Sequence, residues 1–138
     1  MELRDIYKIF PEEKDCFEFL ERTRWDNKPQ CPYCLSGNFT PLNNRYHCNG
    51  CNNTYSVTVG TLFQRTRCDL RKWFYAIYVY EFSDIPLAAR LLASYIDVTK
   101  DTAWLMLGKI RKSNITESNL LNSIRSELLK NKPQRSIR

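Results

Sequence analysis

The sequence predicts a small α+β protein in which short strands lie between helical regions. The chain has 138 residues, of which 43% are hydrophobic, enough for one ordinary domain or two very small ones. Two CxxC pairs enclose residues 31–51, and residues 31–60 carry a single charge, Arg45. Apolar residues recur at helical spacing before this segment and, over a longer stretch, after it. Together these patterns indicate a strand-rich centre flanked by helices.

The first element is a short amphipathic helix over residues 10–25, within an N-terminal segment that we place at residues 1–30. Pro11 and the two glutamates after it suit the first turn of a helix. Phe17 and Leu20 lie three residues apart, which puts them on one face. The residues between this helix and the first cysteine pair, DNKPQ, predict a turn.

Three short strands are expected next. Residues 39–42 and 45–47 flank a pair of asparagines, which tolerate the left-handed backbone of a tight hairpin turn. Residues 54–59 (TYSVTV) are rich in β-branched and aromatic side chains and predict a third strand that ends at Gly60. Three such strands bury too little surface to be stable alone, so a cross-link must hold them together.

Four cysteines at regular spacing provide that cross-link. A CxxC turn presents two sulfurs to one ion, and four soft thiolates complete the tetrahedral shell that zinc prefers. Thirteen residues separate the two pairs, enough for a hairpin that folds the second pair over the first. We therefore predict one structural zinc ion in a three-stranded zinc ribbon over residues 31–62. Its ligands are Cys31, Cys34, Cys48 and Cys51.

The expected compartment favours metal binding over disulfides. Residues 1–15 (MELRDIYKIFPEEKD) are too acidic for a signal peptide, and no stretch approaches the roughly 20 apolar residues of a membrane span. A cytoplasmic protein without membrane contact is expected, and reducing surroundings keep its thiols free. The other two cysteines, Cys16 and Cys68, have no neighbour at ligand spacing and are expected to act as small apolar side chains.

No catalytic residue is predicted. A redox site of the thioredoxin kind uses one CxxC at the start of a helix, and a catalytic zinc keeps open a coordination position that four cysteines would close. His47 is the only histidine, and the symmetrical cysteine spacing favours a strand or surface role for it. The chain also lacks a glycine-rich phosphate loop and a carboxylate cluster for two metals. We expect a protein that is not an enzyme.

An aromatic helix follows the ribbon. Asp69 is positioned to cap it, and residues 70–82 (LRKWFYAIYVYEF) to form it. A last amphipathic helix is predicted over residues 116–129, followed by a disordered basic tail, within a C-terminal segment at residues 113–138. The core-facing stripe of the aromatic helix is Leu70, Trp73, Phe74 and Ile77, and the leucine stripe of the last helix is Leu120, Leu121, Ile124 and Leu128.

A helix-turn-helix is predicted between these two elements, in a helical region that we place at residues 63–112. Pro86 suits the first turn of a helix that ends near Ser94, and residues 95–98 form a short turn. Thr99 caps a second helix that ends near Lys112. The buried side of this second helix is expected to hold Ala103, Trp104, Leu107 and Ile110.

Positive charge is concentrated after the cysteines. Residues 61–112 hold nine basic and five acidic side chains, and residues 113–138 hold five and two, whereas residues 1–30 have a net charge of −2. This distribution suits a polyanion, most simply double-stranded DNA. A helix in a major groove presents short polar groups at its N-terminal end and cations toward phosphates. The predicted DNA contacts are Arg65, Arg67, Arg71, Lys72, Thr99, Lys100, Thr102, Lys109, Arg111 and Lys112.

The order of these motifs resembles the N-terminal region of zinc-ribbon insertion-sequence transposases, in which a zinc-ribbon domain precedes a DDE-type nuclease. The likeness is carried by FP-EE-C-FL-RW, CPYC, CNGC, TYSVTVGTLF, LRKWFYAIY and TAWLMLGKIR, and covers residues 10–112. It implies binding to the terminal inverted repeats of a mobile element. Three features depart from the family, the first of which is the segment LLASYIDVTKD in place of the usual compact L-G-V-S turn. Leu105 stands where an arginine is usual, and residues 113–130 hold no aspartate and predict a helix instead of a nuclease strand.

Two functional hypotheses follow. In the first, the chain is a DNA-binding regulator or accessory factor of a mobile element or phage and does not catalyse transposition. In the second, it is an adaptor or inhibitor that binds a protein partner, or pairs with a second copy, through the ribbon, the aromatic helix and the leucine stripe. An inactive truncated fragment is a third reading of the same residues.

Overall fold

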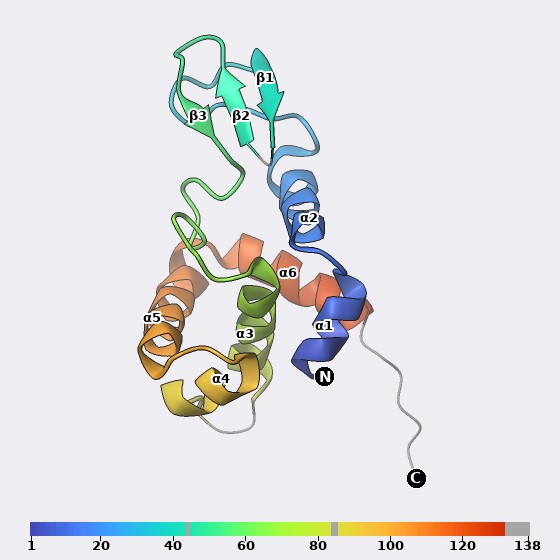
Figure 1. Ribbon diagram of the computed structural model, residues 1–138, viewed down its shortest axis with the longest axis vertical. Helices are drawn as coiled ribbons and strands as arrows, with labels where there is room; N and C mark the ends of the chain where they lie inside the picture. Colours follow the sequence, from blue (N-terminus) through green and yellow to red (C-terminus); the bar gives the residue numbers. More distant parts are fainter. Residues whose placement is uncertain (44, 84–85, 132–138) are drawn as a thin grey trace. The chain divides into compact units, whose positions relative to one another are not determined.

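The computed structural model describes residues 1–43, 45–83 and 86–131, which form two compact units. The ribbon unit, Glu12–Arg67, contains α2 (Glu13–Trp25), β1 (Phe39–Leu42), β2 (Arg45–Cys48) and β3 (Thr54–Tyr55) (Figure 1). The helical unit, Met1–Pro11 with Cys68–Arg138, contains α1 (Leu3–Ile9), α3 (Leu70–Phe82), α4 (Ala89–Ile96), α5 (Lys100–Thr116) and α6 (Ser118–Lys130). The predicted α+β class is confirmed. No helix within the described residues is both long enough and apolar enough to cross a membrane.

The first helix of the ribbon unit, α2, begins three residues later than predicted. The predicted start, Phe10, has φ −123° and ψ 84°, outside the helical region, because the proline that follows it disfavours that region. Glu12 is the extended N-cap, and its backbone N–H donates to the Asp15 carboxylate at 2.9 Å. The predicted end at Trp25 is confirmed, since Asp26 turns into the left-handed region with φ 51°.

The sheet is a three-stranded antiparallel meander, with β2 between β1 and β3. The predicted hairpin is confirmed and pairs Phe39 with Cys48, although Asn44 in its turn lies outside the described residues. The predicted third strand, residues 54–59, is wrong beyond Tyr55. The register pairs Tyr46 with Tyr55, and β2 begins only one residue before Tyr46, so later residues have almost no strand left to pair with. They form successive turns instead.

An aromatic cluster joins α2 to the sheet. The Trp25 ring lies 5.9 Å from the Tyr46 ring and 5.8 Å from the Tyr55 ring, edge to face in both cases. The Tyr46 hydroxyl donates to the Glu21 carboxylate at 2.8 Å. Arg24 also donates to the carbonyl of Val59 at 3.2 Å. These contacts make the N-terminal helix part of the ribbon unit rather than a separate lead-in.

The helix α1 at the start of the chain was not predicted. Its seven residues include the buried Ile6, and Phe10 just beyond it packs edge-on against Phe74 of α3, with ring centroids 5.3 Å apart. The Tyr75 hydroxyl donates to the carbonyl of Met1 at 2.8 Å. The sequence signal is weak because the helix is so short, and its partner helix lies about 70 residues later in the chain.

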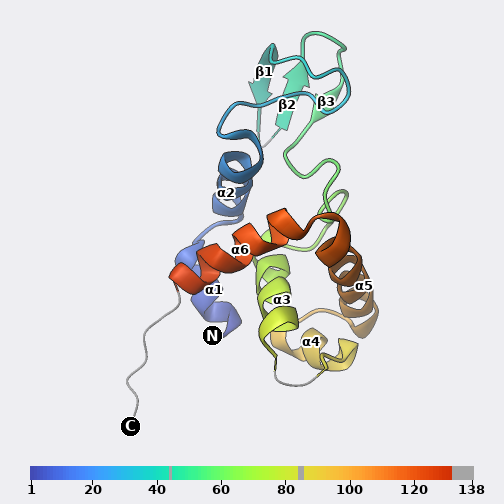
Figure 2. The same cartoon turned by 180° about the vertical axis from the view of Figure 1, so that it is seen from behind.

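The aromatic helix α3 is the centre of the helical unit, and α1, α4, α5 and α6 pack around it (Figures 1 and 2). Its predicted bounds, Leu70–Phe82, and its cap are confirmed, since the Asp69 side chain accepts from the Arg71 backbone N–H at 2.8 Å. The predicted stripe is buried. Tyr75, Ala76 and Tyr78 are buried as well, because helices cover more than one side of α3.

The helices α4 and α5 are joined by three residues. The predicted start of α4 at Pro86 is wrong, because Ala88 is still extended and the helix begins at Ala89. The predicted turn at residues 95–98 is also partly wrong. The buried Ile96 extends α4 to the left-handed Asp97, which closes the helix. Beyond Lys112, α5 continues to Thr116, and α6 then occupies the predicted position, while residues 132–138 of the basic tail lie outside the described residues.

Candidate metal centre and nucleic-acid interface

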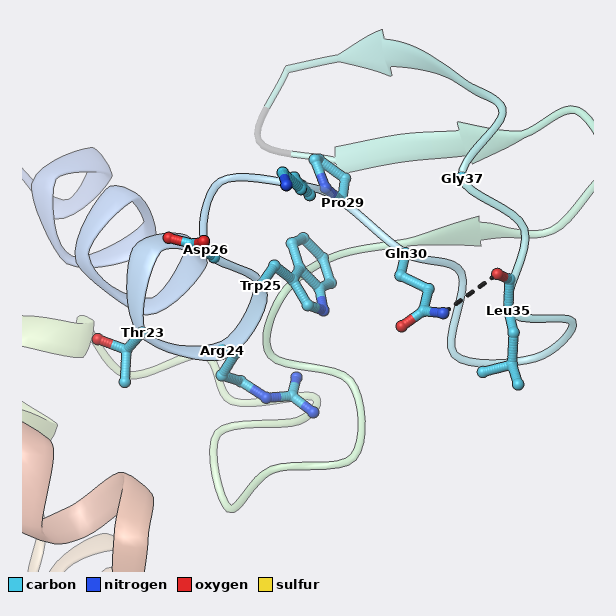
Figure 3. Close-up of a pocket in the computed structure, with 9 residues that line it drawn as sticks. Thr23, Arg24, Trp25, Asp26, Pro29, Gln30, Leu35 and Gly37 are labelled. Atoms are coloured by element: carbon cyan, nitrogen blue, oxygen red, sulfur yellow. Dashed lines mark hydrogen bonds between the residues drawn. The ribbon is translucent and has the colours of Figure 1, made fainter.

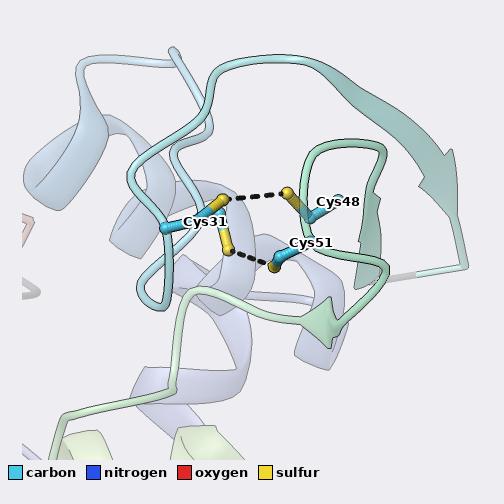
Figure 4. A group of neighbouring side chains, drawn as sticks. Cys31, Cys48 and Cys51 are labelled. Atoms are coloured by element: carbon cyan, nitrogen blue, oxygen red, sulfur yellow. Dashed lines mark hydrogen bonds between the residues drawn. The ribbon is translucent and has the colours of Figure 1, made fainter.

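The four predicted zinc ligands converge in the ribbon unit. Their Sγ atoms all lie within 4.8 Å of one another. The shortest contacts cross between the two pairs, 3.6 Å from Cys31 to Cys51 and 3.4 Å from Cys34 to Cys48 (Figure 4). A tetrahedral zinc ion with bonds of about 2.3 Å holds its sulfurs about 3.8 Å apart, close to these spacings. The four thiols therefore form a site for a single zinc ion.

Both CxxC loops have the same backbone shape. The N–H of Leu35 donates to the Cys31 carbonyl at 2.9 Å, and the N–H of Asn52 donates to the Cys48 carbonyl at 2.9 Å. Leu35 and Asn52 each follow the second cysteine of a pair, and both have φ 64°. This left-handed step turns the chain sharply enough to direct two sulfurs to one point. Asparagine tolerates this conformation well, whereas leucine does so at some energetic cost.

Backbone N–H groups stabilise the thiolate forms of Cys48 and Cys51. The Asn53 backbone N–H, helped by its side-chain amide 3.3 Å from the sulfur, lowers the pKa of Cys51 to about 6. The Cys51 backbone N–H likewise lowers the pKa of Cys48. At Cys34 the Ser36 N–H lowers the pKa, but hydrogen bonding to Cys48 and burial outweigh it and raise the pKa to about 12. Zinc binding must therefore displace protons, and acid must weaken it.

The remaining cysteines and the histidine lie outside this cluster. His47 pairs with Thr40 and Thr54 in the sheet, which is the predicted strand role. Cys16 is fully buried on α2, and Cys68 is half-buried just before α3. Among the described residues, the four ribbon cysteines are the only group of three or more potential ligands close enough to share an ion.

A shallow pocket of about 520 Å³ lies beside the metal centre, between the end of α2 and the first CxxC loop (Figure 3). Trp25 forms part of its wall, and the Gln30 side-chain amide donates to the Leu35 carbonyl at 3.2 Å. Asp26 is the only carboxylate among the lining residues, which include no histidine or cysteine. The lining therefore offers neither a thiol nucleophile nor an imidazole base.

The predicted basic cluster around residues 65–72 is divided between the two units. Arg65 and Arg67 are exposed in the ribbon unit. In the helical unit, the Arg71 guanidinium bonds Asp69 at 2.9 Å and the Pro11 carbonyl at 2.9 Å, and it lies 4.2 Å from the centre of the Tyr7 ring. Lys72 donates to the Asp97 carbonyl at 3.2 Å. Arg71 in particular is engaged in joining α1 to α3.

The predicted contacts on α5 fall into two groups. Thr99 is the N-cap, and its hydroxyl accepts from the Thr102 N–H at 3.1 Å and donates to the Thr102 hydroxyl at 2.9 Å. The second group consists of exposed cations, none of which forms an ion pair with any residue that the structure describes. These four are Lys100, Lys109, Arg111 and Lys112.

The predicted burial of Trp104 is wrong. Its side chain is 66% exposed, and that of the adjacent Leu105 is 57% exposed. The buried face of α5 runs instead through Ala103, Met106, Leu107, Ile110 and Ser113, so Met106 occupies the core position expected of the tryptophan. A helical stripe of this kind places Trp104 at its outer edge.

A buried arginine was also missed. Arg125 of α6 is 7% exposed and donates to the side-chain oxygen of Asn114 at 2.8 Å, with the Glu81 carboxylate 3.8 Å away. Burial lowers its pKa. It ties α6 to α5 and α3, so its charge, like that of Arg71, is used inside the helical unit. The contacts of Arg71 with Pro11 and of Arg125 with Glu81 were not predictable from local sequence, because these partners lie far away in the chain.

Comparison with known proteins agrees with the ribbon geometry. Residues 11–54 match the family described as the transposase zinc-ribbon domain. An uncharacterized protein in transposable element ISH50 of Halobacterium salinarum is 32% identical in an alignment of 103 residues, which covers 70% of this chain and 34% of that protein. The chain thus spans about a third of the length of this relative. No solved structure matches. The matched segment includes all four zinc ligands, so the metal centre lies within the part of the chain that is similar to transposase zinc-ribbon domains.

Proposed function

We propose that this chain binds double-stranded DNA through its helical unit, as a regulator or accessory factor of a mobile element or phage that does not catalyse transposition. The observation that carries the proposal is the outward face of α5, whose cations have no ion-pair partner among the described residues. The setting is supported by the similarity to a protein in a transposable element. The zinc ribbon has no catalytic part in this proposal, because four thiolates close its coordination shell.

The connection between α4 and α5 supports a helix-turn-helix. The turn consists of Asp97, Val98 and the cap Thr99, and the Val98 N–H closes α4 by donating to the Ala93 carbonyl at 3.1 Å. The two helices pack against one another and against α3. A second helix supported in this way can present its far side to a major groove.

Charge also separates the two units. The helical unit holds 14 basic and 9 acidic residues, and the ribbon unit holds 7 and 6. A polyanion is therefore attracted mainly to the helical unit. Within it, Arg71 and Arg125 are occupied by contacts inside the protein, so we assign the main phosphate contacts to Lys100, Lys109, Arg111 and Lys112. Arg65, Arg67 and Lys72 are candidates for additional contacts.

The competing adaptor hypothesis loses two of the surfaces that it needs. Trp73 and Phe74 of α3 are buried, as are Leu121, Ile124 and Leu128 of α6. The aromatic helix and most of the leucine stripe thus pack inside the chain. A protein partner or a second copy would have to use other residues.

A gel-shift salt series with a random-sequence 30-bp duplex tests the proposal. The logarithm of affinity should fall with the logarithm of salt concentration, with a slope of about −0.9 for each neutralised phosphate. Combined charge reversal at Lys109, Arg111 and Lys112 should reduce the slope by about 3 and weaken binding at least 100-fold.

The matched control reverses three exposed lysines elsewhere, at Lys14, Lys28 and Lys130, with the same change in net charge. It should weaken binding less than tenfold. A flat salt response, or equal losses in the two triple variants, would contradict binding through α5.

A further inference from the structure

The outward face of α5 is not uniformly charged. In the first nine residues of the helix, the exposed positions are Lys100, Asp101, Trp104, Leu105 and Gly108. Gly108 follows Trp104 by four residues and Leu105 by three, so these three share one side of the helix. We call them the apolar face. It presents the largest exposed aromatic side chain among the described residues next to a position with no side chain.

The fold of the chain does not account for this face. A tryptophan and a leucine that are more than half exposed contribute little to the core. A Cβ atom added at Gly108 would meet nothing within 4 Å, so no neighbour in the chain requires glycine there. Glycine inside a helix is less favourable than alanine, and its usual justification is the close approach of another backbone or a ligand. These features point to contact with something outside the chain.

The charge around the apolar face favours DNA as that partner. Arg111 and Lys112 follow Trp104 and Leu105 by seven residues, two turns further along the same side. These cations, with Lys109, are exposed and have no ion-pair partner among the described residues. An apolar surface at the start of a helix and cations toward its end match a groove floor bordered by phosphates.

The chemistry of the face limits which bases it can read. Bidentate recognition of guanine uses arginine or lysine, and that of adenine uses asparagine or glutamine. Among the exposed side chains of residues 100–108, only Lys100 is of these types, and it lies at the first position of the helix. Large apolar side chains instead contact the C5-methyl group of thymine, which projects into the major groove.

We propose that Trp104 and Leu105 recognise thymine methyl groups in the major groove, and that Gly108 lets the groove edge approach the helix. This inference rests on the proposed DNA binding by α5 and adds the class of base that the helix reads. The chain should therefore prefer sites with thymines over sites without methyl groups at the same positions.

Replacement of thymine by deoxyuridine tests this preference, because it removes the methyl group and keeps the charge and base pairing. The probes are two A·T-rich 30-bp duplexes of one sequence, one with thymine and one with deoxyuridine throughout. The full chain should bind the thymine duplex more tightly, by about fourfold for each methyl group in contact. The W104A/L105A variant should bind both duplexes equally, at the level of the deoxyuridine duplex.

The control variant Leu129→Ala removes a partly exposed leucine from α6 and should retain the thymine preference. Circular dichroism should show that all three proteins are equally helical. Tight binding without a difference between the duplexes would overturn the inference and leave DNA binding intact, whereas no binding to either would overturn the proposed function itself. Self-association that is lost in W104A/L105A, with DNA affinity unchanged, would assign the face to a second copy and overturn the inference.

Discussion

The ribbon unit and the helical unit are stabilised by different physical means. The ribbon has strands of four, four and two residues around one aromatic cluster, too little to remain folded without its zinc ligands. The helical unit buries α3 among four other helices and has an apolar core of ordinary kind. Stability in the ribbon is therefore concentrated in four sulfurs, whereas in the helical unit it is distributed over many side chains.

Loss of zinc should have the largest effect on stability, and it tests whether the two units differ in this way. Treatment with a chelator, or the substitution Cys48→Ser, should unfold the ribbon unit, since structural zinc typically contributes about 10 kcal/mol or more to folding. The helices of the helical unit, α1 and α3 to α6, should remain protected. Hydrogen exchange followed by mass spectrometry reports the two units separately. Cys68→Ser, outside the cluster, is the matched control and should leave both units folded. Joint unfolding would show that the helical unit depends on the metal.

The reverse experiment damages the core of the helical unit. Phe74→Ala removes a fully buried ring that packs against Phe10, and should cost about 3–5 kcal/mol of the free energy of unfolding. The variant should still bind one zinc ion per chain, measured by release of the metal on thiol modification. Phe82→Ala, on the same helix but partly exposed, should cost clearly less. If Phe74→Ala also abolished zinc binding, the units would not be independent.

A smaller effect on stability should arise at Asp69, whose carboxylate pairs with the Arg71 guanidinium that joins α1 to α3. Burial raises the pKa of Asp69, but hydrogen bonds from Arg71 outweigh it and lower the pKa below its usual value. Because the folded-state pKa is depressed, Asp69 stabilises the fold above about pH 4, and this contribution is lost as the pH falls through the folded-state value.

Two substitutions at Asp69 separate its charge from its capping role. Asp69→Ala removes both and should cost about 2 kcal/mol at pH 7, whereas Asp69→Asn keeps an N-cap acceptor and should cost about half of that. Urea unfolding at pH 7 and below pH 3 measures the difference. The gap between the natural chain and the asparagine variant should close in acid. A gap that is unchanged in acid would mean that the carboxylate charge is not the stabilising feature.

The sequence predicted the elements whose signals are local. The CxxC spacing was enough to identify the zinc site, and Asp69 with its aromatic stripe predicted the bounds of α3. The third strand failed because its length is set by the few residues of β2, not by its own β-branched composition. The helix α1 was missed because it is stabilised by packing against α3, which lies much later in the sequence.

Prediction from the sequence was limited in a different way for the residues of the proposed DNA interface. Proximity in the sequence grouped Arg67 with Arg71, yet the Arg71 guanidinium bonds a residue 60 positions earlier. A helical period identifies a stripe of side chains but not its centre, so Trp104 was assigned to the core although it lies beside it. Exposed apolar residues beside a buried stripe break the pattern on which core prediction depends.

The smallest expected change in stability occurs at Gly108, where stability and function should diverge. Gly108→Ala should stabilise the helical unit by about 0.5–1 kcal/mol, because alanine is favoured inside a helix and the added Cβ meets no neighbour. If DNA approaches the helix at this point, the same methyl group should weaken DNA binding. Urea unfolding should show the gain in stability, and gel shifts on the same preparation should show the loss of DNA affinity. A variant that is more stable and binds DNA as tightly as the natural chain would show that no partner comes close to α5 at Gly108. The four zinc ligands of the ribbon are expected to act through folding, so their substitution should not separate the two properties in this way.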